Sequence, residues 1–320
     1  MIIVTGIKGL LGGRLARYLV RSGVDVIGTS RCANDEYAGE VARATGADIL
    51  TMEAAQHLAN DRPIDAIIHA AGPAAAACKA DPEKATSDRQ DLANDVMALA
   101  KLHQARLCVF STTDVYPQPL AGAIDISTPT GGAHSPYAAS HLAAEAVIAS
   151  GAQSLAQPPV ILRLGNMYGA PVVAGAPCWH LLMQHACRSA MIEHAVQLND
   201  ATSSFRAYSP IRALEQIIGR VLAPVTSLPP VHAQLYNFAP AGPAQAGKMV
   251  LLVKALMKKH FDMDIEINFD EADIQHDTPP YHFTGNWTDD GKGVSSPLMK
   301  QWRDSELVDL LSFCRSVASS

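Results

Sequence analysis

Long apolar runs are missing from this sequence of 320 residues. No apolar stretch reaches the roughly 18 residues that a membrane-spanning helix needs, so no membrane segment is predicted. Charged residues make up only 18% of the chain and the formal net charge is −6. This charge disfavours nucleic acid as a partner, because binding to phosphates needs clustered Lys and Arg.

A disulfide or zinc framework is also not indicated. The six cysteines include no Cys-x-x-Cys pair, a pattern that favours reduced, packed thiols and a cytoplasmic protein. The opening residues, MIIVTG, lack the basic stretch of a signal peptide and are expected to form a buried strand.

Short β-rich runs alternate with longer helical stretches over the first two-thirds of the chain. Hydrophobic residues make up 48% of the sequence, which is ordinary for a globular protein. The expected strands are residues 1–6, 24–31, 66–72, 106–113 and 158–169, and the expected helices include 9–23, 88–104 and 137–150. This order is typical of βαβ units, so the fold class is α/β, a Rossmann-type doubly wound parallel sheet. We expect a dinucleotide-binding domain at 1–168 and a smaller substrate-binding region at 169–320, partly interleaved with it.

The segment TGIKGLLGG is a candidate dinucleotide loop. Gly6, Gly9 and Gly12 lie between an expected strand and an expected helix, with Leu11 in the same turn. Such a turn needs positive φ, close approach of the backbone to a pyrophosphate, and a helix N-terminus with unpaired N–H groups. The alternative is a tight turn without a ligand. The flanking strand and helix favour binding of a nicotinamide dinucleotide.

The end of the second strand bears on the choice between NAD and NADP. A carboxylate there would bind the ribose 2′-hydroxyl of NAD, whereas Arg favours the 2′-phosphate of NADP. Ser30 and Arg31 stand at this point and no acid does. NADP is therefore slightly favoured over NAD, unless Arg31 is only a surface charge.

Several further segments carry a resemblance to a known family. They are HAAG (69–72), STTDVY (111–116), SPYAASHLAAE (135–145), LRLGNMYGAP (162–171), FRAYSPIRAL (205–214) and YNFAPAG (236–242). In this order, over nearly the whole length, the chain resembles an extended short-chain dehydrogenase/reductase of the NAD-dependent epimerase/dehydratase family.

The resemblance implies a catalytic tyrosine with one altered neighbour. Tyr137 would exchange a proton with a sugar hydroxyl or keto oxygen, and Thr112 would hydrogen-bond that oxygen, unless its hydroxyl only caps the loop. His141 stands one helical turn after Tyr137, where the family has Lys. A neutral imidazole would stabilise a phenolate less than a lysine does. We expect either a working site with altered pH dependence, a site with reduced hydride chemistry, or a cofactor-binding relative without turnover.

The resemblance also assigns residues to the cofactor and the substrate. His69, Ala70 and Ala71 would lie under the cofactor, and Tyr137 and His141 would contact it. Thr113, Asn166 and Arg206 would bind the substrate, with Asn166 and Arg206 near its phosphates, although Ala207 replaces the acid that usually follows.

Asp114 precedes the Val-Tyr pair where dehydratases of the family carry Glu. It is either a shortened acid/base residue or a loop cap. Dehydration is therefore less expected than reduction or epimerisation.

The predicted function is an NAD(P)-dependent epimerase or keto-reductase that acts on a nucleotide sugar. The partner is thus a small molecule, and a homodimer is expected through the helices at 88–104 and 137–150, as in the family. A reductase of a small carbonyl metabolite and a non-catalytic cofactor-binding protein remain as alternatives. His180, His185 and His194, expected on one helical stretch, lack the spacing of metal ligands, and no metal is predicted.

Overall fold

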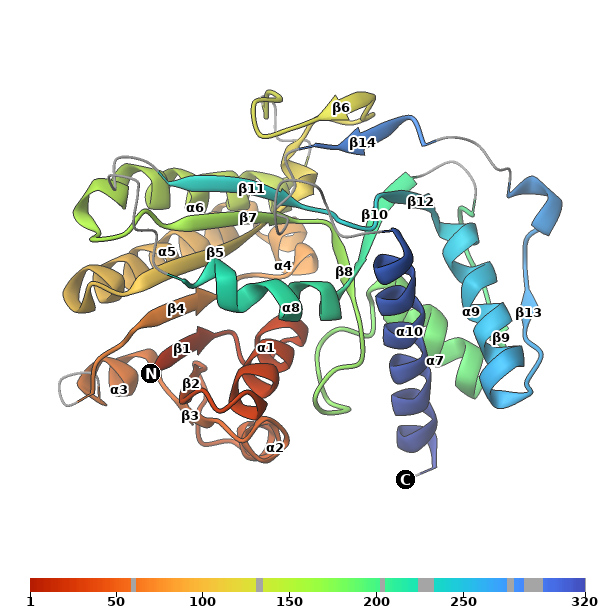
Figure 1. The fold of residues 1–320 in the computed structure, drawn as a ribbon, viewed down its shortest axis with the longest axis horizontal. Coiled ribbons are helices and arrows are strands. Elements are labelled where there is room, and N and C mark those ends of the chain that lie inside the picture. The colour runs from red at the N-terminus through yellow and green to blue at the C-terminus, as the bar shows by residue number, and fades with distance from the viewer. Residues whose placement is uncertain are drawn as a thin grey trace. The chain divides into compact units, whose positions relative to one another are not determined.

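The computed structural model describes residues 1–58, 62–130, 135–201, 205–223, 233–274, 279–284 and 296–319 (Figure 1). These residues form two compact units. The first contains Met1–Pro119, Ile126–Leu164 and Ile217–Phe238, and the second Leu120–Asp125, Gly165–Gln216 and Ala239–Ser320. The domain boundary at residue 168 stays a prediction, because compactness alone does not define independently folding parts.

The first unit is built on a seven-stranded sheet in the order β11-β7-β5-β4-β1-β2-β3, with all neighbours parallel. Its strands are β1 (Ile2–Thr5), β2 (Val26–Thr29), β3 (Asp48–Leu50), β4 (Ala66–His69), β5 (Arg106–Thr112), β7 (Val160–Leu164) and β11 (Gln234–Phe238). The strand order reverses between β1 and β4, which confirms the doubly wound Rossmann-type sheet. In such folds the ligand binds at the carboxyl ends of the strands where the order reverses.

Several helices of the first unit begin after a short polar residue that caps them. The helices of this unit are α1 (Leu10–Arg21), α2 (Glu36–Thr45), α3 (Met52–Leu58), α4 (Ala75–Ala80), α5 (Pro82–His103) and α6 (Pro136–Gly151), with 3-10 turns η1 (Thr113–Val115) and η2 (Ala152–Ser154). Asp81 accepts a hydrogen bond from the backbone of Lys84 at 3.0 Å, and Pro82 follows at the first helical position. This cap explains why α5 begins six residues before the predicted start at 88.

The core of the first unit lies between the sheet and the helix pair α5 and α6, which run side by side in Figure 1. Ile3, Ile67 and Leu107 of the strands and Val96 and Ile148 of the two helices are fully buried in one cluster. Burial of such side chains is the main source of stability for this unit.

The second unit combines small sheets with three long helices. Its sheets are β12-β10-β8, β13-β9 and β14-β6. Their strands are β6 (Gly122–Ile124), β8 (Asn166–Tyr168), β9 (Ala195–Val196), β10 (Phe205–Pro210), β12 (Pro243–Gln245), β13 (Glu266–Ile267) and β14 (Tyr281–Phe283). The helices are α7 (Leu182–Ile192), α9 (Ala246–Phe261) and α10 (Ser296–Ala318), with η3 (Glu271–Asp273), while α8 (Ile211–Val221) continues from this unit into the first. Val250, Val253, Leu307 and Leu310 form part of its buried core.

Two expectations about local structure were wrong. The segment 158–169, predicted as one strand that ends in a loop, is two strands that belong to different sheets. The chain changes course at Gly165, where an added Cβ would lie 2.6 Å from the Ala207 carbonyl oxygen. Of the three histidines expected on one helical stretch, only His185 lies in α7, because the helix begins at Leu182, after His180, and ends at Ile192, before His194.

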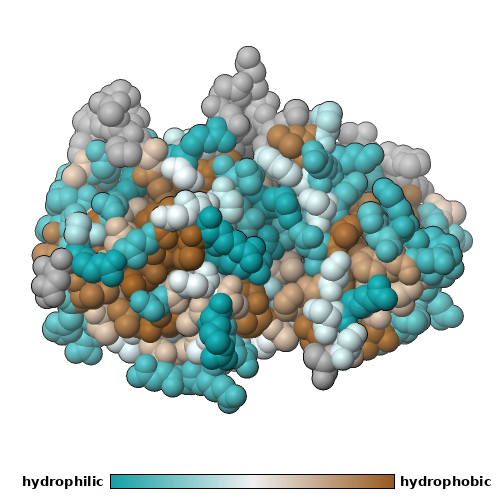
Figure 2. Space-filling model, turned by 60° about the horizontal axis from the view of Figure 1, so that its bottom comes forward, coloured by the Kyte–Doolittle hydropathy of each residue, from teal (hydrophilic) through white to brown (hydrophobic). Residues whose placement is uncertain are grey.

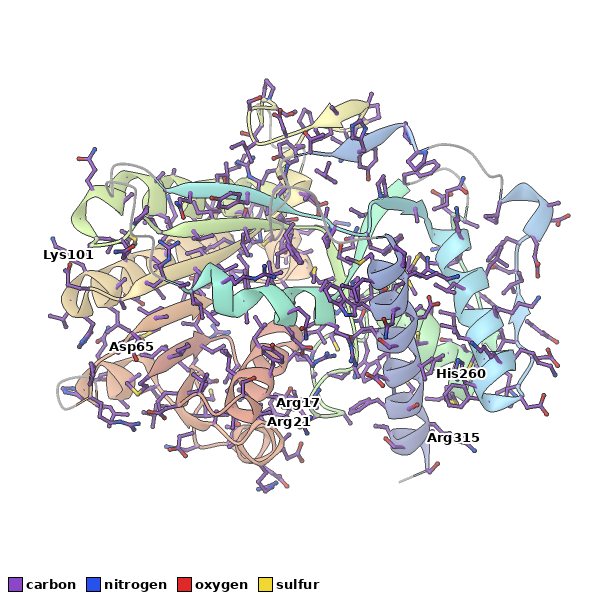
Figure 3. The ribbon with its side chains drawn as sticks, in the orientation of Figure 1. Arg17, Arg21, Asp65, Lys101, His260 and Arg315 are labelled. Atoms are coloured by element: carbon purple, nitrogen blue, oxygen red, sulfur yellow. The ribbon has the colours of Figure 1, made fainter. Side chains whose placement is uncertain are left out.

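In Figure 2 hydrophilic and apolar residues are interspersed over the face shown. Three basic side chains labelled in Figure 3 stand in the last turn of a helix, where a positive charge complements the helix dipole: Arg21 in α1, Lys101 in α5 and Arg315 in α10. Within the described ranges, no helix combines the length and apolar character required to cross a membrane.

Candidate active site

The glycine loop after β1 has the geometry that a pyrophosphate needs. Gly6 has a φ of +69°, and a Cβ there would lie 2.8 Å from the backbone of Ala70. A Cβ at Gly12 would lie 2.3 Å from the Gly6 carbonyl oxygen. Gly9 precedes α1, and no side chain caps this helix, so its first N–H groups are left to an anion. The residues present therefore fit a dinucleotide.

The loop after β4 is tied to the glycine loop by Thr5. Its Oγ1 accepts hydrogen bonds from the N–H groups of Ala70 and Ala71, both at 3.2 Å, and lies 2.8 Å from Nδ1 of His69. The structure thus brings together the two segments predicted to hold the cofactor. Burial lowers the pKa of His69 to about 4, with Arg89 contributing, so this imidazole is neutral at pH 7.

The chain after β2 has a basic neighbour that sequence reasoning missed. Ser30 Oγ hydrogen-bonds the backbone of Cys32, and Arg31 is exposed. Lys8 of the glycine loop donates to the Cys32 carbonyl oxygen at 3.2 Å and forms an ion pair with Asp35 at 2.6 Å. Lys8 could have been predicted as this neighbour from its place between the glycines. The glycine turn follows β1, and β1 pairs in parallel with β2, so the turn lies next to the chain that follows β2.

Tyr137 stands in the first turn of α6, which Ser135 caps through the N–H of Ala138 at 3.1 Å. Its ring meets His141 edge to face, with centroids 4.6 Å apart, and the guanidinium carbon of Arg89 lies 5.5 Å from its centroid. Burial raises the pKa of Tyr137, and the positive charge of Arg89 opposes this rise. At neutral pH the phenol is therefore protonated and can donate a proton.

His141 carries no charge at neutral pH. It is 6% exposed, and burial first, then Arg89 and His69, lower its pKa well below the ordinary value. Its Nε2 is buried and has no hydrogen-bond partner among the described residues. A cavity of about 10 Å³, lined in part by His141 and Arg89, adjoins it. The imidazole therefore cannot act as a cation at neutral pH, and its predicted contact with a ribose hydroxyl stays a prediction.

Thr112 and Asp114 form a small turn at the end of β5. Thr112 Oγ1 accepts a hydrogen bond from the N–H of Asp114 at 3.1 Å, so the hydroxyl does cap the loop. An acceptor hydroxyl keeps its own proton for a second partner, and the predicted contact to a reacting oxygen stays a prediction. Thr113 is buried and Asp114 is partly exposed.

A buried polar network behind Tyr137 was also missed. Glu145, two turns along α6 from Tyr137, accepts hydrogen bonds from Arg163 Nε at 3.0 Å and Nη2 at 2.6 Å, and from Ser111 Oγ at 2.5 Å. Arg163 also donates to the hydroxyl of Tyr116 at 3.0 Å. The spacing of Glu145 from His141 was a signal, since residues four apart share a helix face. The network fixes α6 to β5 and β7.

Arg89, which contacts the ring of Tyr137, was also not predicted from the sequence. It lies on the buried face of α5, four residues after Ala85 and four before Ala93, both buried. An arginine in line with small apolar residues on a helix was the signal, because such a position faces the core.

Asn166 and Arg206 belong to the second unit, where the structure brings them into one small sheet. Asn166 of β8 pairs with Tyr208 of β10, and Arg206, also on β10, is exposed and pairs with Ala244 of β12. Their predicted contacts with substrate phosphates stay predictions.

Two features together define a short-chain dehydrogenase/reductase type of protein. One is a parallel sheet with a glycine turn after its first strand, and the other is a tyrosine in the first turn of a helix beside the switch point. Residues 2–196 match the model of the family described as NAD dependent epimerase/dehydratase family. The match covers more than half of the chain, which therefore belongs to this family of enzymes. No curated protein sequence matches the chain.

Solved structures agree with this fold over almost the full length. UDP-glucose 4-epimerase from Bifidobacterium longum is 19% identical, with a TM-score of 0.69 and coverage of 98% of this chain and 97% of the other. UDP-glucuronic acid 4-epimerase from Bacillus cereus is 17% identical, with a TM-score of 0.69 and coverage of 99% of both chains. ADP-L-glycero-D-manno-heptose-6-epimerase from Helicobacter pylori is 14% identical, with a TM-score of 0.71 and coverage of 98% and 96%. At these identities the likeness establishes the fold.

Proposed function

We propose that the protein is an NAD(P)-dependent enzyme that epimerises a nucleotide sugar or reduces a keto group on one, with Tyr137 as the acid/base residue. The observation that carries this proposal is the phenol of Tyr137 in the first turn of α6, in the same compact unit as the intact glycine loop. Membership of the NAD dependent epimerase/dehydratase family supports this reaction class. The structures of the B. longum and B. cereus enzymes, in complex with NAD and with UDP or UDP-glucuronic acid, favour a nucleotide sugar as the substrate.

The protein's own residues bind, orient and exchange a proton. When bound, a nicotinamide cofactor supplies the hydride chemistry. Tyr137 donates a proton to the developing oxyanion in reduction, and accepts one from a hydroxyl in oxidation. Its raised pKa favours the donor role at neutral pH, so keto reduction is the easier half of the reaction. In this proposal Thr112 hydrogen-bonds the same oxygen and Asp114 is a secondary candidate for proton transfer.

Cofactor binding in this proposal uses the glycine loop, the loop after β4 at His69, Ala70 and Ala71, which lies under the cofactor, and α6. Gly6, Gly9, Gly12 and the start of α1 hold the pyrophosphate, and Nε2 of His141 bonds a ribose hydroxyl. The exposed Arg31, with no carboxylate at the end of β2, favours NADP over NAD. In the same proposal Asn166 and Arg206 bind the substrate diphosphate, and two copies pair through α5 and α6.

The experiment that tests the proposed function is incubation with a panel of nucleotide sugars. The purified protein is first denatured and its supernatant analysed by mass spectrometry for a retained cofactor. The protein is then incubated with UDP-glucose or UDP-glucuronic acid and NAD or NADP, or with a 4-keto nucleotide sugar and NADPH, and the products are followed by proton NMR. We expect an epimer or a reduced sugar with the parent protein and none with Tyr137→Phe. Turnover only of small carbonyl compounds, or equal turnover by Tyr137→Phe, would contradict the proposal.

A further inference from the structure

Arg89 is a buried cation that has no carboxylate partner among the described residues. It is 6% exposed. Its Nε donates to Ser140 Oγ at 3.0 Å and its Nη2 to the Pro73 carbonyl oxygen at 2.6 Å, and both acceptors are neutral. Burial lowers its pKa, but a guanidinium stays protonated in proteins. A buried charge without an opposite charge is costly for folding. The presence of Arg89 here therefore indicates a role other than stabilising the fold.

The surroundings of Arg89 hold its guanidinium against Tyr137. The guanidinium carbon lies 5.5 Å from the centroid of the Tyr137 ring. Ser140, which anchors Nε, lies in the same helix as Tyr137, three residues on. Gly72, after β4, packs against the other side, since a Cβ there would lie 2.3 Å from Nη1. Three segments thus fix the position of the cation: α5, the loop after β4 and α6.

The other titratable groups around Tyr137 do not supply a positive charge. Asp114 of η1 and Cys78 of α4 face it and both disfavour a phenolate. His141, on the same helix, is neutral at pH 7 because its pKa is lowered well below the ordinary value. His69 of β4, which faces His141, is neutral too. Among the groups described around the phenol, Arg89 is the one that favours its ionised form.

We propose that Arg89 is a positioning residue that stabilises the phenolate form of Tyr137, and so takes over the electrostatic role that a neutral His141 cannot fill. The inference rests on the proposed function, because it matters for turnover only if Tyr137 exchanges a proton with the substrate. An opposite charge at this distance favours the ionised form of an acid. In this proposal Arg89 of α5 supplies the positive charge, and His141 of α6 keeps the contact with the cofactor.

The test measures the ionisation of Tyr137 itself. The near-ultraviolet phenolate absorbance is titrated in the protein without added substrate, and the titration of Tyr137→Phe is subtracted. Arg89→Met removes the charge, Arg89→Gln removes it but keeps hydrogen-bond donors, and Arg89→Lys restores it. Arg106→Met is the matched control: Arg106 is 4% exposed, bonds the Pro158 carbonyl oxygen and Gln234, and does not contact Tyr137.

We expect the midpoint of Tyr137 ionisation to rise by about 1 pH unit in Arg89→Met and Arg89→Gln. In Arg89→Lys the midpoint should return most of the way to its value in the parent protein, and in Arg106→Met it should be unchanged. The limb of kcat/KM that reports Tyr137 should move by the same amount, about tenfold in rate per pH unit. If Arg89→Met does not fold, Arg89→Gln and Arg89→Lys still decide the question.

An unmoved midpoint in a folded neutral variant, or equal midpoints in Arg89→Gln and Arg89→Lys, would overturn the inference and leave Arg89 a structural role. A shifted midpoint together with full activity of Tyr137→Phe would instead refute the proposed function, and would leave the electrostatic coupling of the two residues standing.

Discussion

Breaking the ion pair between Glu145 and Arg163 should strongly destabilise the first unit. Both side chains are nearly inaccessible to solvent, at 11% and 5%. Glu145 accepts two hydrogen bonds from Arg163 and one from Ser111. Arg163 in turn donates to Tyr116, whose hydroxyl donates to Asn237 at 2.7 Å. Removing one partner leaves the other charge buried and uncompensated.

The perturbation is Glu145→Gln, which keeps the shape of the side chain and removes its charge. Breaking one side of a buried ion pair costs about 3–5 kcal/mol, and the amide of Gln can still accept one hydrogen bond, so we expect about 3 kcal/mol. Arg163→Met should cost a similar amount. In the double variant the costs should not add, because each single change already removes the shared interaction.

The assay is urea unfolding followed by circular dichroism, with free energies from linear extrapolation. Lys84→Met is the matched control, because Lys84 pairs with Asp88 on the exposed face of α5; it should leave the unfolding midpoint unchanged. A loss below about 1 kcal/mol in Glu145→Gln, or additive losses in the double variant, would refute the reasoning that this pair is buried and cooperative.

Three further predictions concern the cofactor loops and pH. Gly6→Ala should abolish NAD(P)H binding, measured by cofactor fluorescence, because the added Cβ would clash with the backbone of Ala70. The control is Gly23→Ala, which is also at positive φ but has nothing within 4 Å, and it should bind the cofactor normally. Normal binding by Gly6→Ala would contradict the loop assignment. Arg31→Ala should weaken NADPH binding about tenfold and spare NADH, and equal effects on both would remove the case for NADP. His69 has a lowered pKa, about 4 against 6.5, so it adds stability above pH 6.5 that is lost as the pH falls from 6.5 to 4. The loss is about 3 kcal/mol, it should be reduced in His69→Gln, and an unchanged pH slope of the unfolding free energy in that variant would count against it.

The sheet and its helices were predictable because their signals are local. Alternating buried strands and amphipathic helices gave the α/β class, and the turn Gly6–Gly12 gave the strand-to-helix loop. The break at Gly165 was not predictable, because it depends on the close approach of Ala207 from a strand some forty residues later. The sequence of 158–169 alone reads as one strand that ends in a loop.

The candidate site was predictable where its residues follow each other in the chain and missed where they do not. Tyr137 and His141 share one helix, and their contact follows from a spacing of four residues. Arg89 reaches Tyr137 from another helix, and no local pattern states which helices pack together. The prediction that His141 supplies little charge rested on the chemistry of imidazole. The neighbour that compensates for it became visible only in three dimensions.

The most direct measurement of the central claim is a single-turnover experiment that follows the absorbance of reduced nicotinamide. Parent protein and Tyr137→Phe are loaded with NADP or NAD to the same occupancy and mixed with UDP-glucose or UDP-glucuronic acid, or loaded with NADPH and mixed with a 4-keto nucleotide sugar. We predict a rapid absorbance change in the parent with at least one of these, and a rate at least a hundredfold lower in Tyr137→Phe. Equal rates in the two proteins at equal cofactor occupancy would contradict the claim that this phenol carries the proton.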